Sequence, residues 1–140
     1  MIDPSTLSDR EIVARTAWGE ARNQGVEGMQ GVINVIFNRA ALHWQGETTA
    51  RGVCLHRKQF DCWLPGDPNL PKLLAVTDAD PQYAEALQLA DSAFAGTLAD
   101  ITGGADSYEV EGTGAYWGVG LTPSAQIGDQ DFYVTRKITS

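Results

Sequence analysis

One acidic residue lies in a segment that could support acid–base chemistry. The segment Trp18-Gly19-Glu20-Ala21-Arg22 falls where a predicted helix ends. A carboxyl group there meets the negative end of the helix dipole, and a neighbouring indole and glycine favour desolvation, so both effects raise the pKa of Glu20. A glutamic acid that stays protonated near neutral pH can donate a proton to a leaving oxygen. The alternative is a solvated Glu20 that pairs with Arg22 or a lysine.

The cysteines and histidines offer little for metal or thiol chemistry. The chain has only Cys54, Cys62, His43 and His56. A zinc site built on the two cysteines would need further soft ligands, so we expect no metal and no cofactor. The same residues provide no zinc triad or Cys–His pair for cleaving peptide or amide bonds. The two cysteines either form a local disulfide or stay reduced, and the sequence leaves both readings open.

Size and charge narrow the class of protein. The 140 residues, 43% hydrophobic and 20% charged, fit a single domain spanning 1–140. The net charge of −8 and the lack of a large basic cluster argue against a nucleic-acid partner. The apolar run at 32–37 is too short to cross a bilayer, and we expect a monomer without stable membrane association.

Hydrophobic spacing predicts a helical core. Helices are expected at about 8–22, 26–42, 49–55 and 80–96. The first begins with a capping box formed by Ser8 and Glu11, and the last begins with Asp80 as its cap and Pro81 in its first turn. The second carries the widest apolar stripe and is expected to be the central helix. Gly28 and Gly31 within it suggest close approach of another backbone.

The rest of the chain gives three further local predictions. The prolines at 65–71 predict a loop. The inner face of the helix at 80–96 is expected to consist of Ala84, Leu87, Ala90 and Phe94. Glycines and aromatic residues crowd into 103–120, which predicts an irregular C-terminal third with short strands. The expected fold class is therefore mainly α (α+β), with a helical core.

Several separated blocks together form a more specific pattern than the Glu20 segment alone. In chain order they are Trp18-Gly-Glu-Ala-Arg22, Gly25-Val26-Glu27-Gly28 through Asn34 and Asn38-Arg39, Cys54, Gln59-Phe60-Asp61-Cys62-Trp63, Thr102-Gly103-Gly104-Ala105, Ile127-Gly128 and Phe132-Tyr133. In this order and spacing, about residues 8–135 resemble the cell wall hydrolase family typified by the spore cortex-lytic enzymes.

The resemblance implies a lysozyme-like catalytic domain that cleaves the MurNAc–GlcNAc bond of peptidoglycan. Glu20 matches the family's catalytic acid. The substrate-binding positions implied are Gln59, Phe60, Trp63, Tyr108 and Trp117. Aromatic rings can pack on sugar faces, and amides can bond hydroxyl and N-acetyl groups. Asn34, Asn38 and Arg39 are expected to hold neighbouring loops in place.

Better-characterised members of the family behave as lytic transglycosylases, and one carboxyl group suffices for that reaction. In it, Glu20 protonates the glycosidic oxygen and then accepts the proton of the muramyl 6-hydroxyl, giving a 1,6-anhydro sugar. A hydrolytic muramidase is the alternative, with water positioned by Asp106, Glu109 or Glu111 as a second carboxylate. Asp61 lies at a place where the family accepts a neutral residue. An inert wall-binding module is the alternative from another class.

Two segments depart from the family pattern, and both affect substrate contacts. Relatives often have histidines on either side of the tyrosine after Thr-Gly-Gly, whereas here Ser107 and Glu109 flank Tyr108. The Ile-Gly block is often followed by Asn-His, and here it continues with Asp129-Gln130. These differences leave the acid in place but bear on glycan preference.

The site of action implied is the bacterial cell wall, in the periplasm or outside the cell. The first residues contain no basic segment leading into an apolar stretch, so no secretory signal is visible. The sequence fits a phage lysin released from the host cytoplasm and a secreted bacterial domain without its leader equally well.

Overall fold

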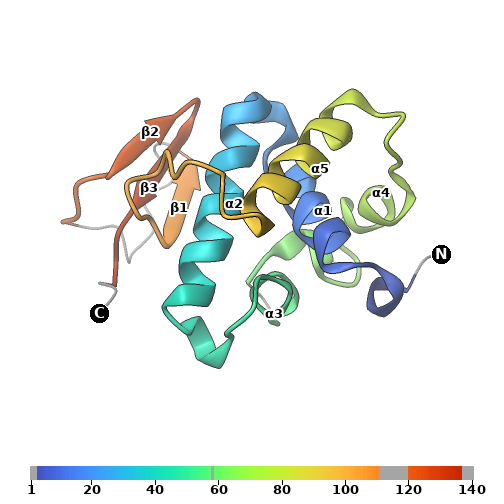
Figure 1. Ribbon diagram of the computed structural model, residues 1–140, viewed down its shortest axis with the longest axis horizontal. Coiled ribbons are helices and arrows are strands. Elements are labelled where there is room, and N and C mark those ends of the chain that lie inside the picture. Colours follow the sequence, from blue (N-terminus) through green and yellow to red (C-terminus); the bar gives the residue numbers. More distant parts are fainter. Residues whose placement is uncertain (1–2, 58, 111–119, 137–140) are drawn as a thin grey trace.

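The computed structural model describes residues 3–57, 59–110 and 120–136. Five helices and three strands follow in chain order: α1 (Asp9–Ala21), α2 (Gly25–Ala41), α3 (Ala50–Leu55), α4 (Leu70–Ala75), α5 (Pro81–Phe94), β1 (Ser107–Val110), β2 (Ala125–Ile127) and β3 (Gln130–Tyr133). Figure 1 shows the strands on one side of α2 and the other helices on its opposite side. The predicted helical core with short C-terminal strands is confirmed.

The start and end of α1 follow from local sequence. The Ser8 hydroxyl accepts a hydrogen bond from the Glu11 backbone N–H, and the Glu11 carboxylate accepts one from the Ser8 N–H, each at 3.2 Å. The predicted capping box is therefore present. After α1, a single 3₁₀ turn leads to Gly25, whose φ of +76° lies in the left-handed region that favours glycine. This turn reverses the chain into α2 and leaves Glu20 in the last turn of α1.

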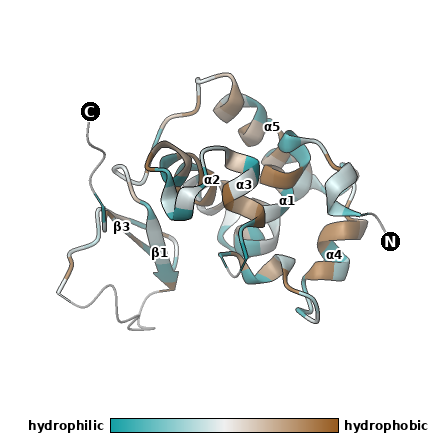
Figure 2. Cartoon of the chain, turned by 90° about the horizontal axis from the view of Figure 1, so that it is seen from below, coloured by the Kyte–Doolittle hydropathy of each residue, from teal (hydrophilic) through white to brown (hydrophobic). Residues whose placement is uncertain are grey.

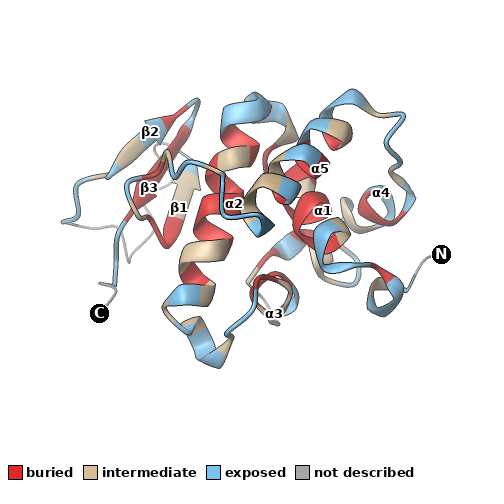
Figure 3. Cartoon of the chain, in the orientation of Figure 1, coloured by how far each residue is buried: buried red, intermediate tan, exposed pale blue. Residues whose placement is uncertain are grey.

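The central position predicted for α2 is confirmed. It packs against α1, α3 and α5 and also touches β2, and Figure 3 shows buried residues along much of its length. Figure 2 shows the hydrophobic residues mainly on the helices. A Cβ added to Gly31 would lie 2.6 Å from the Phe132 ring, and one added to Gly28 would lie 2.3 Å from the Gln24 side chain. The close neighbours of both glycines are thus side chains, and the predicted approach of another backbone is wrong.

The sheet is antiparallel, with β3 between β1 and β2. Phe132 in β3 is fully buried and pairs with Tyr108 of β1 on one side and Ala125 of β2 on the other. Asn34 and Asn38 of α2 hold the segment before the sheet. Asn34 bonds backbone atoms of residues 99 and 101, and Asn38 donates to the carbonyl oxygen of residue 105. The predicted structural role of these two amides is confirmed.

Two local predictions are wrong. The proline-rich stretch predicted as a loop contains α4, which buries Leu73 and Leu74. On α5 the inner face is rotated from the predicted one. Tyr83 and Ala86 are buried together with Leu87 and Ala90, whereas Phe94 is 46% exposed. Phe94 instead packs edge-on against Phe37 at the rim, with ring centroids 5.1 Å apart.

None of the helices in the described ranges is both long and apolar enough to span a bilayer.

Candidate active site

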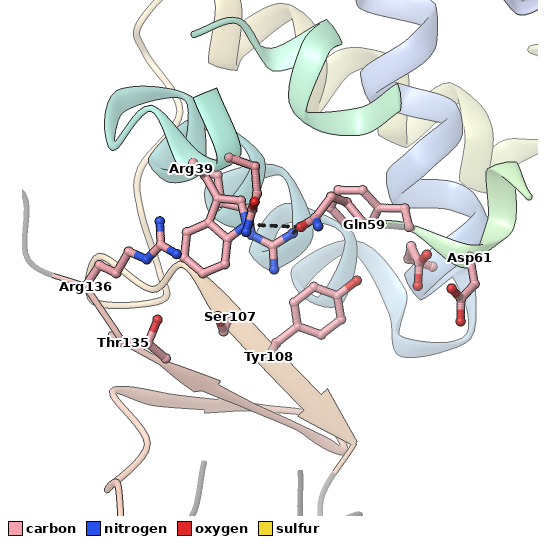
Figure 4. A pocket seen from close by; sticks show the side chains of 11 residues that line it. Arg39, Gln59, Asp61, Ser107, Tyr108, Thr135 and Arg136 are labelled. Atoms are coloured by element: carbon pink, nitrogen blue, oxygen red, sulfur yellow. Dashed lines mark hydrogen bonds between the residues drawn. The ribbon is translucent and has the colours of Figure 1, made fainter. Parts of the chain in front are cut away.

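A cleft of about 810 Å³ opens where the end of α1, the end of α2, the segment after α3 and strand β1 come together. Figure 4 shows side chains from these elements converging on it. Its lining residues are Glu20, Arg39, Trp44, Gln45, Gln59, Phe60, Asp61, Ser107, Tyr108, Thr135 and Arg136. They come from distant parts of the chain, so the cleft exists only in the folded protein.

Glu20 is half-buried in the last turn of α1 and lines this cleft. Burial raises the pKa of Glu20, and the negative charge of Asp61 raises it further. The Cys62 thiol and backbone N–H and the Tyr108 hydroxyl interact with the carboxylate and oppose this rise in its pKa. The predicted increase in the pKa of Glu20 is confirmed, with desolvation as its largest cause.

Arg22 does not neutralise Glu20. Its guanidinium donates hydrogen bonds to the carbonyl oxygens of Trp18 and Gly19 and to the Asn69 side chain, and it stacks on the Trp18 ring at 4.3 Å. Arg22 thus caps the carbonyl end of α1. The alternative of a solvated, ion-paired Glu20 is wrong for the described residues.

Glu20 also lines a second cavity of about 360 Å³, together with Gly19, Arg22, Asn23 and Asn69. This cavity and the main cleft have no other lining residue in common. Glu20 is therefore the one described residue that lines both cavities.

Asp61 brings a second carboxylate to the same cleft. It is exposed, it directly precedes Cys62, and its charge acts on Glu20. The positions predicted for a second carboxylate lie elsewhere. Asp106 is fully buried and accepts hydrogen bonds from Ser107, from Thr135 and from the backbone of Arg136.

The remaining acidic candidates are Glu109 and Glu111. Glu109 accepts a hydrogen bond from the Tyr133 hydroxyl at 3.1 Å and is not among the residues that line the cleft. Glu111 lies outside the described residues. Among the described acidic residues, Asp61 is therefore the one that shares the cleft with Glu20.

The wall formed by the end of α2 and the 3₁₀ turn Trp44–Gly46 after it is cationic and aromatic. Arg39 donates from Nε to the carbonyl oxygen of Asp106 at 2.7 Å and from Nη1 to Oε1 of Gln59 at 3.4 Å. The indole N–H of Trp44 donates to the same Oε1 at 3.0 Å. These bonds fix the Gln59 amide, whose Nε2 makes no hydrogen bond to the other described residues. Arg39 has the predicted structural contacts and also lines the cleft.

The other predicted substrate positions divide into three groups. Phe60 and Tyr108 line the cleft, although Phe60 is only 3% exposed. Trp63 packs on the helical core, and its indole N–H donates to the buried Thr16 hydroxyl at 2.8 Å. It is not among the lining residues, so its position favours a structural role. Trp117 lies outside the described residues.

The two cysteines are buried and unpaired with each other. Burial raises the pKa of Cys54 to about 12 and also raises the pKa of Cys62. Thiols with such high pKa values are protonated at neutral pH and are poor nucleophiles. In the described part of the chain, no group of three or more His, Cys, Asp and Glu side chains is arranged to hold a metal ion.

Sequence reasoning missed several cleft residues. Trp44, Gln45, Ser107, Thr135 and Arg136 belong to short connections or strand ends with no recognisable motif. The sequence does contain one signal for Arg39. This residue lies next to the apolar stripe of α2, and a buried arginine needs specific partners, which marks it as a candidate site residue.

Comparisons with known proteins agree with the architecture. The catalytic domain of the Bacillus cereus SleB protein has a similar structure, with a TM-score of 0.66, 21% identity, and coverage of 89% of this chain and 88% of that one. The catalytic domain of a germination-specific lytic transglycosylase, SleB from Bacillus anthracis, has a TM-score of 0.65, 22% identity, and coverage of 94% and 99%. The lysozyme-like α+β fold is thereby confirmed.

The curated protein sequences contain no significant match to this chain. A family profile described as Cell Wall Hydrolase matches residues 23–133, a segment that begins just after Glu20. The match covers most of the sequence, from the 3₁₀ turn that follows α1 to the last strand of the sheet. The chain belongs to the cell wall hydrolase family.

Proposed function

We propose that this protein cleaves the MurNAc–GlcNAc bond of peptidoglycan as a lytic transglycosylase, with Glu20 as its single essential acid and base. The observation that carries the proposal is a desolvated carboxyl group of raised pKa on a residue that lines the main cleft together with Gln59 and Tyr108. A sugar strand that lies in this cleft would present a glycosidic bond to Glu20. The activity belongs at the bacterial cell wall.

The cleft also has the composition expected for carbohydrate. Tyr108 contributes aromatic surface, which packs against the apolar faces of pyranose rings. The Gln59 amide is held by Arg39 and Trp44 through its oxygen, so its NH₂ group is available to an acceptor such as an N-acetyl carbonyl. Gln59 and Tyr108 are therefore proposed as substrate contacts, whereas the buried Phe60 is proposed to support the cleft wall beneath the Arg39 guanidinium.

The reaction requires two proton transfers at one side chain. The protonated Glu20 donates its proton to the glycosidic oxygen as the C1–O bond breaks, and the GlcNAc unit leaves with a 4-hydroxyl. The Glu20 carboxylate then accepts the proton of the muramyl 6-hydroxyl while O6 bonds to C1. The product is a 1,6-anhydromuramyl end, no water is consumed, and Glu20 regains its starting protonation state.

Asp61 favours one alternative, a hydrolytic muramidase. Its carboxylate lines the cleft with Glu20 and could orient a water molecule toward C1. The negative charge of Asp61 raises the pKa of Glu20 and so favours a protonated Glu20 beside it, as a muramidase with one acid and one carboxylate requires. This alternative differs from the transglycosylase reaction in its products.

Mass spectrometry of the fragments released from purified peptidoglycan tests the proposal. Transglycosylase products carry anhydro ends and are lighter by one water than hydrolysed products. A mixture dominated by anhydro ends supports the proposal, and reducing ends would favour the muramidase. Binding to walls without release of soluble fragments would instead indicate an inert wall-binding module.

A further inference from the structure

The two ends of the main cleft carry opposite charges. Glu20 and Asp61 supply the acidic groups, whereas Arg39 and Arg136 supply guanidinium groups. Figure 4 shows Arg136 and Asp61 at opposite ends of the cleft, with Tyr108 between them. This cationic end occurs in a chain whose net charge is −8. Solubility is served by the excess of negative charge, so it does not account for two arginines at this end of the cleft.

Arg39 is an incompletely compensated buried cation. It is 8% exposed, and no carboxylate in the described ranges lies within 4.0 Å of its guanidinium. The Asp106 carboxylate attracts it, but that group already accepts hydrogen bonds from Thr135, Ser107 and the backbone of Arg136. The Glu20 carboxyl group attracts it as well, but makes no ion pair with it within 4.0 Å. Arg39 itself uses two of its donors, on the Asp106 carbonyl and Gln59. A guanidinium has five N–H donors, so others remain.

Arg136 adds a second guanidinium to the same wall. It stacks on the Trp44 ring at 4.1 Å, and Arg39 approaches that ring at 4.8 Å. Within the described part of the chain, the Arg136 side chain makes no ion pair or hydrogen bond. Two like charges around one indole repel each other, and an anion between or beside them would relieve this repulsion.

We propose that Arg136 and Arg39 form a subsite for a carboxylate carried by the 3-O-lactyl substituent of a muramyl residue. Guanidinium groups bind carboxylates through paired N–H donors, which gives direction as well as charge. The subsite rests on the proposed function for its choice of ligand. Arg136 lies at the end of the cleft opposite Asp61, so this subsite would select strands by their substituents without taking part in the proton transfers. The carboxylate is either that of a bare lactyl group or one within an attached stem peptide.

Binding of a soluble GlcNAc–MurNAc disaccharide bearing a stem peptide tests this subsite by calorimetry. The disaccharide lacks the MurNAc–GlcNAc bond, so binding is measured without turnover, and failure of the proposed function would show separately on long strands. The comparison ligands are the same compound with its carboxylates converted to amides, and the peptide-free disaccharide with a lactyl carboxylate. The proteins are the wild type, Arg136→Gln, Arg136→Lys and, as a control for loss of one charge, Arg10→Gln. Arg10 pairs with Asp91 on the exposed surface.

We expect amidation to weaken binding to the wild type by about tenfold or more, as for a charged hydrogen bond. Arg136→Gln should remove most of that difference, Arg136→Lys should restore part of it, and Arg10→Gln should retain it. Strong binding of the peptide-free disaccharide identifies the lactyl carboxylate as the ligand, and weak binding identifies the stem peptide. Equal affinities for the charged and amidated ligands, an undiminished difference in Arg136→Gln, or no binding at about millimolar ligand would overturn the subsite.

Discussion

The Tyr108 hydroxyl, on strand β1, interacts with the Glu20 carboxyl at the end of helix α1. The pKa of each group is raised by burial, and each also affects the other. Tyr108 in turn packs against Phe132 in the middle of the sheet, with ring centroids 5.6 Å apart. The small sheet thus helps to set the protonation of a residue on the helical core.

Replacing Tyr108 with phenylalanine should shift the basic limb of the pH–activity profile to higher pH. The hydroxyl opposes the rise in the pKa of Glu20, and its loss lets that pKa rise further. Because the acid is active while protonated, activity then persists to higher pH. The measurement is kcat/KM against pH on purified strands. An unchanged basic limb would contradict a coupling between the two groups.

Asp61→Asn should shift the same limb in the opposite direction. The charge of Asp61 raises the pKa of Glu20, so its removal lowers that pKa and moves the basic limb to lower pH. Near the acidic end of the profile, activity should fall less than tenfold, because Asp61 performs no proton transfer in the transglycosylase scheme. A loss of about a thousandfold or more at every pH would instead assign Asp61 a direct role, as in a muramidase.

Glu20→Gln should be more stable than the wild type at neutral pH. The pKa of Glu20 is higher in the folded than in the unfolded state, so the folded protein binds more protons between those two values. The wild type therefore loses stability as pH rises through the folded-state pKa. Urea unfolding should show a larger advantage of the variant at about pH 7 than at about pH 4. The exposed Glu85→Gln on α5 serves as control, and an equal advantage at both pH values would contradict the burial argument.

Gly31→Ala should destabilise the fold by about 1–3 kcal/mol. An added Cβ would meet Phe132 Cζ at 2.6 Å, and this ring is fully buried between α2 and the sheet. In an open helical position the same change would stabilise the protein by about 1 kcal/mol. The sign of the change in unfolding free energy therefore checks the packing of the sheet on α2, and a gain in stability would refute it.

Local signals predicted the parts of the fold that depend on neighbours in sequence. The Ser8–Glu11 capping box and the Asp80 cap of α5 are complete within a few residues, and both appear as predicted. α4 was missed because Asn69 forms no side-chain cap and Pro71 lies in a short segment that resembles a loop. Its burial of Leu73 depends on contacts with α1, which periodicity within six residues cannot reveal.

In the site, too, local sequence predicts some residues, and contacts between distant segments determine the others. Glu20 was recognisable because its motif is contiguous and its helix could be predicted. The sequence does not identify Asp61 as a partner of Glu20, because the two residues come together only in the folded protein and the residues next to Asp61 in sequence carry no such signal. Arg136 likewise reaches the cleft only because residues 135–136 are bound to the buried Asp106 carboxylate. Contacts between distant segments decide these positions.

The most direct test of the central claim compares Glu20→Gln with the wild type in the release of soluble fragments from purified peptidoglycan. Glutamine preserves the size of the side chain but can neither donate nor accept the transferred proton. We expect a folded variant, verified by circular dichroism, whose rate is lower by about three orders of magnitude or more. A folded variant that releases fragments at nearly the wild-type rate would contradict the role assigned to Glu20.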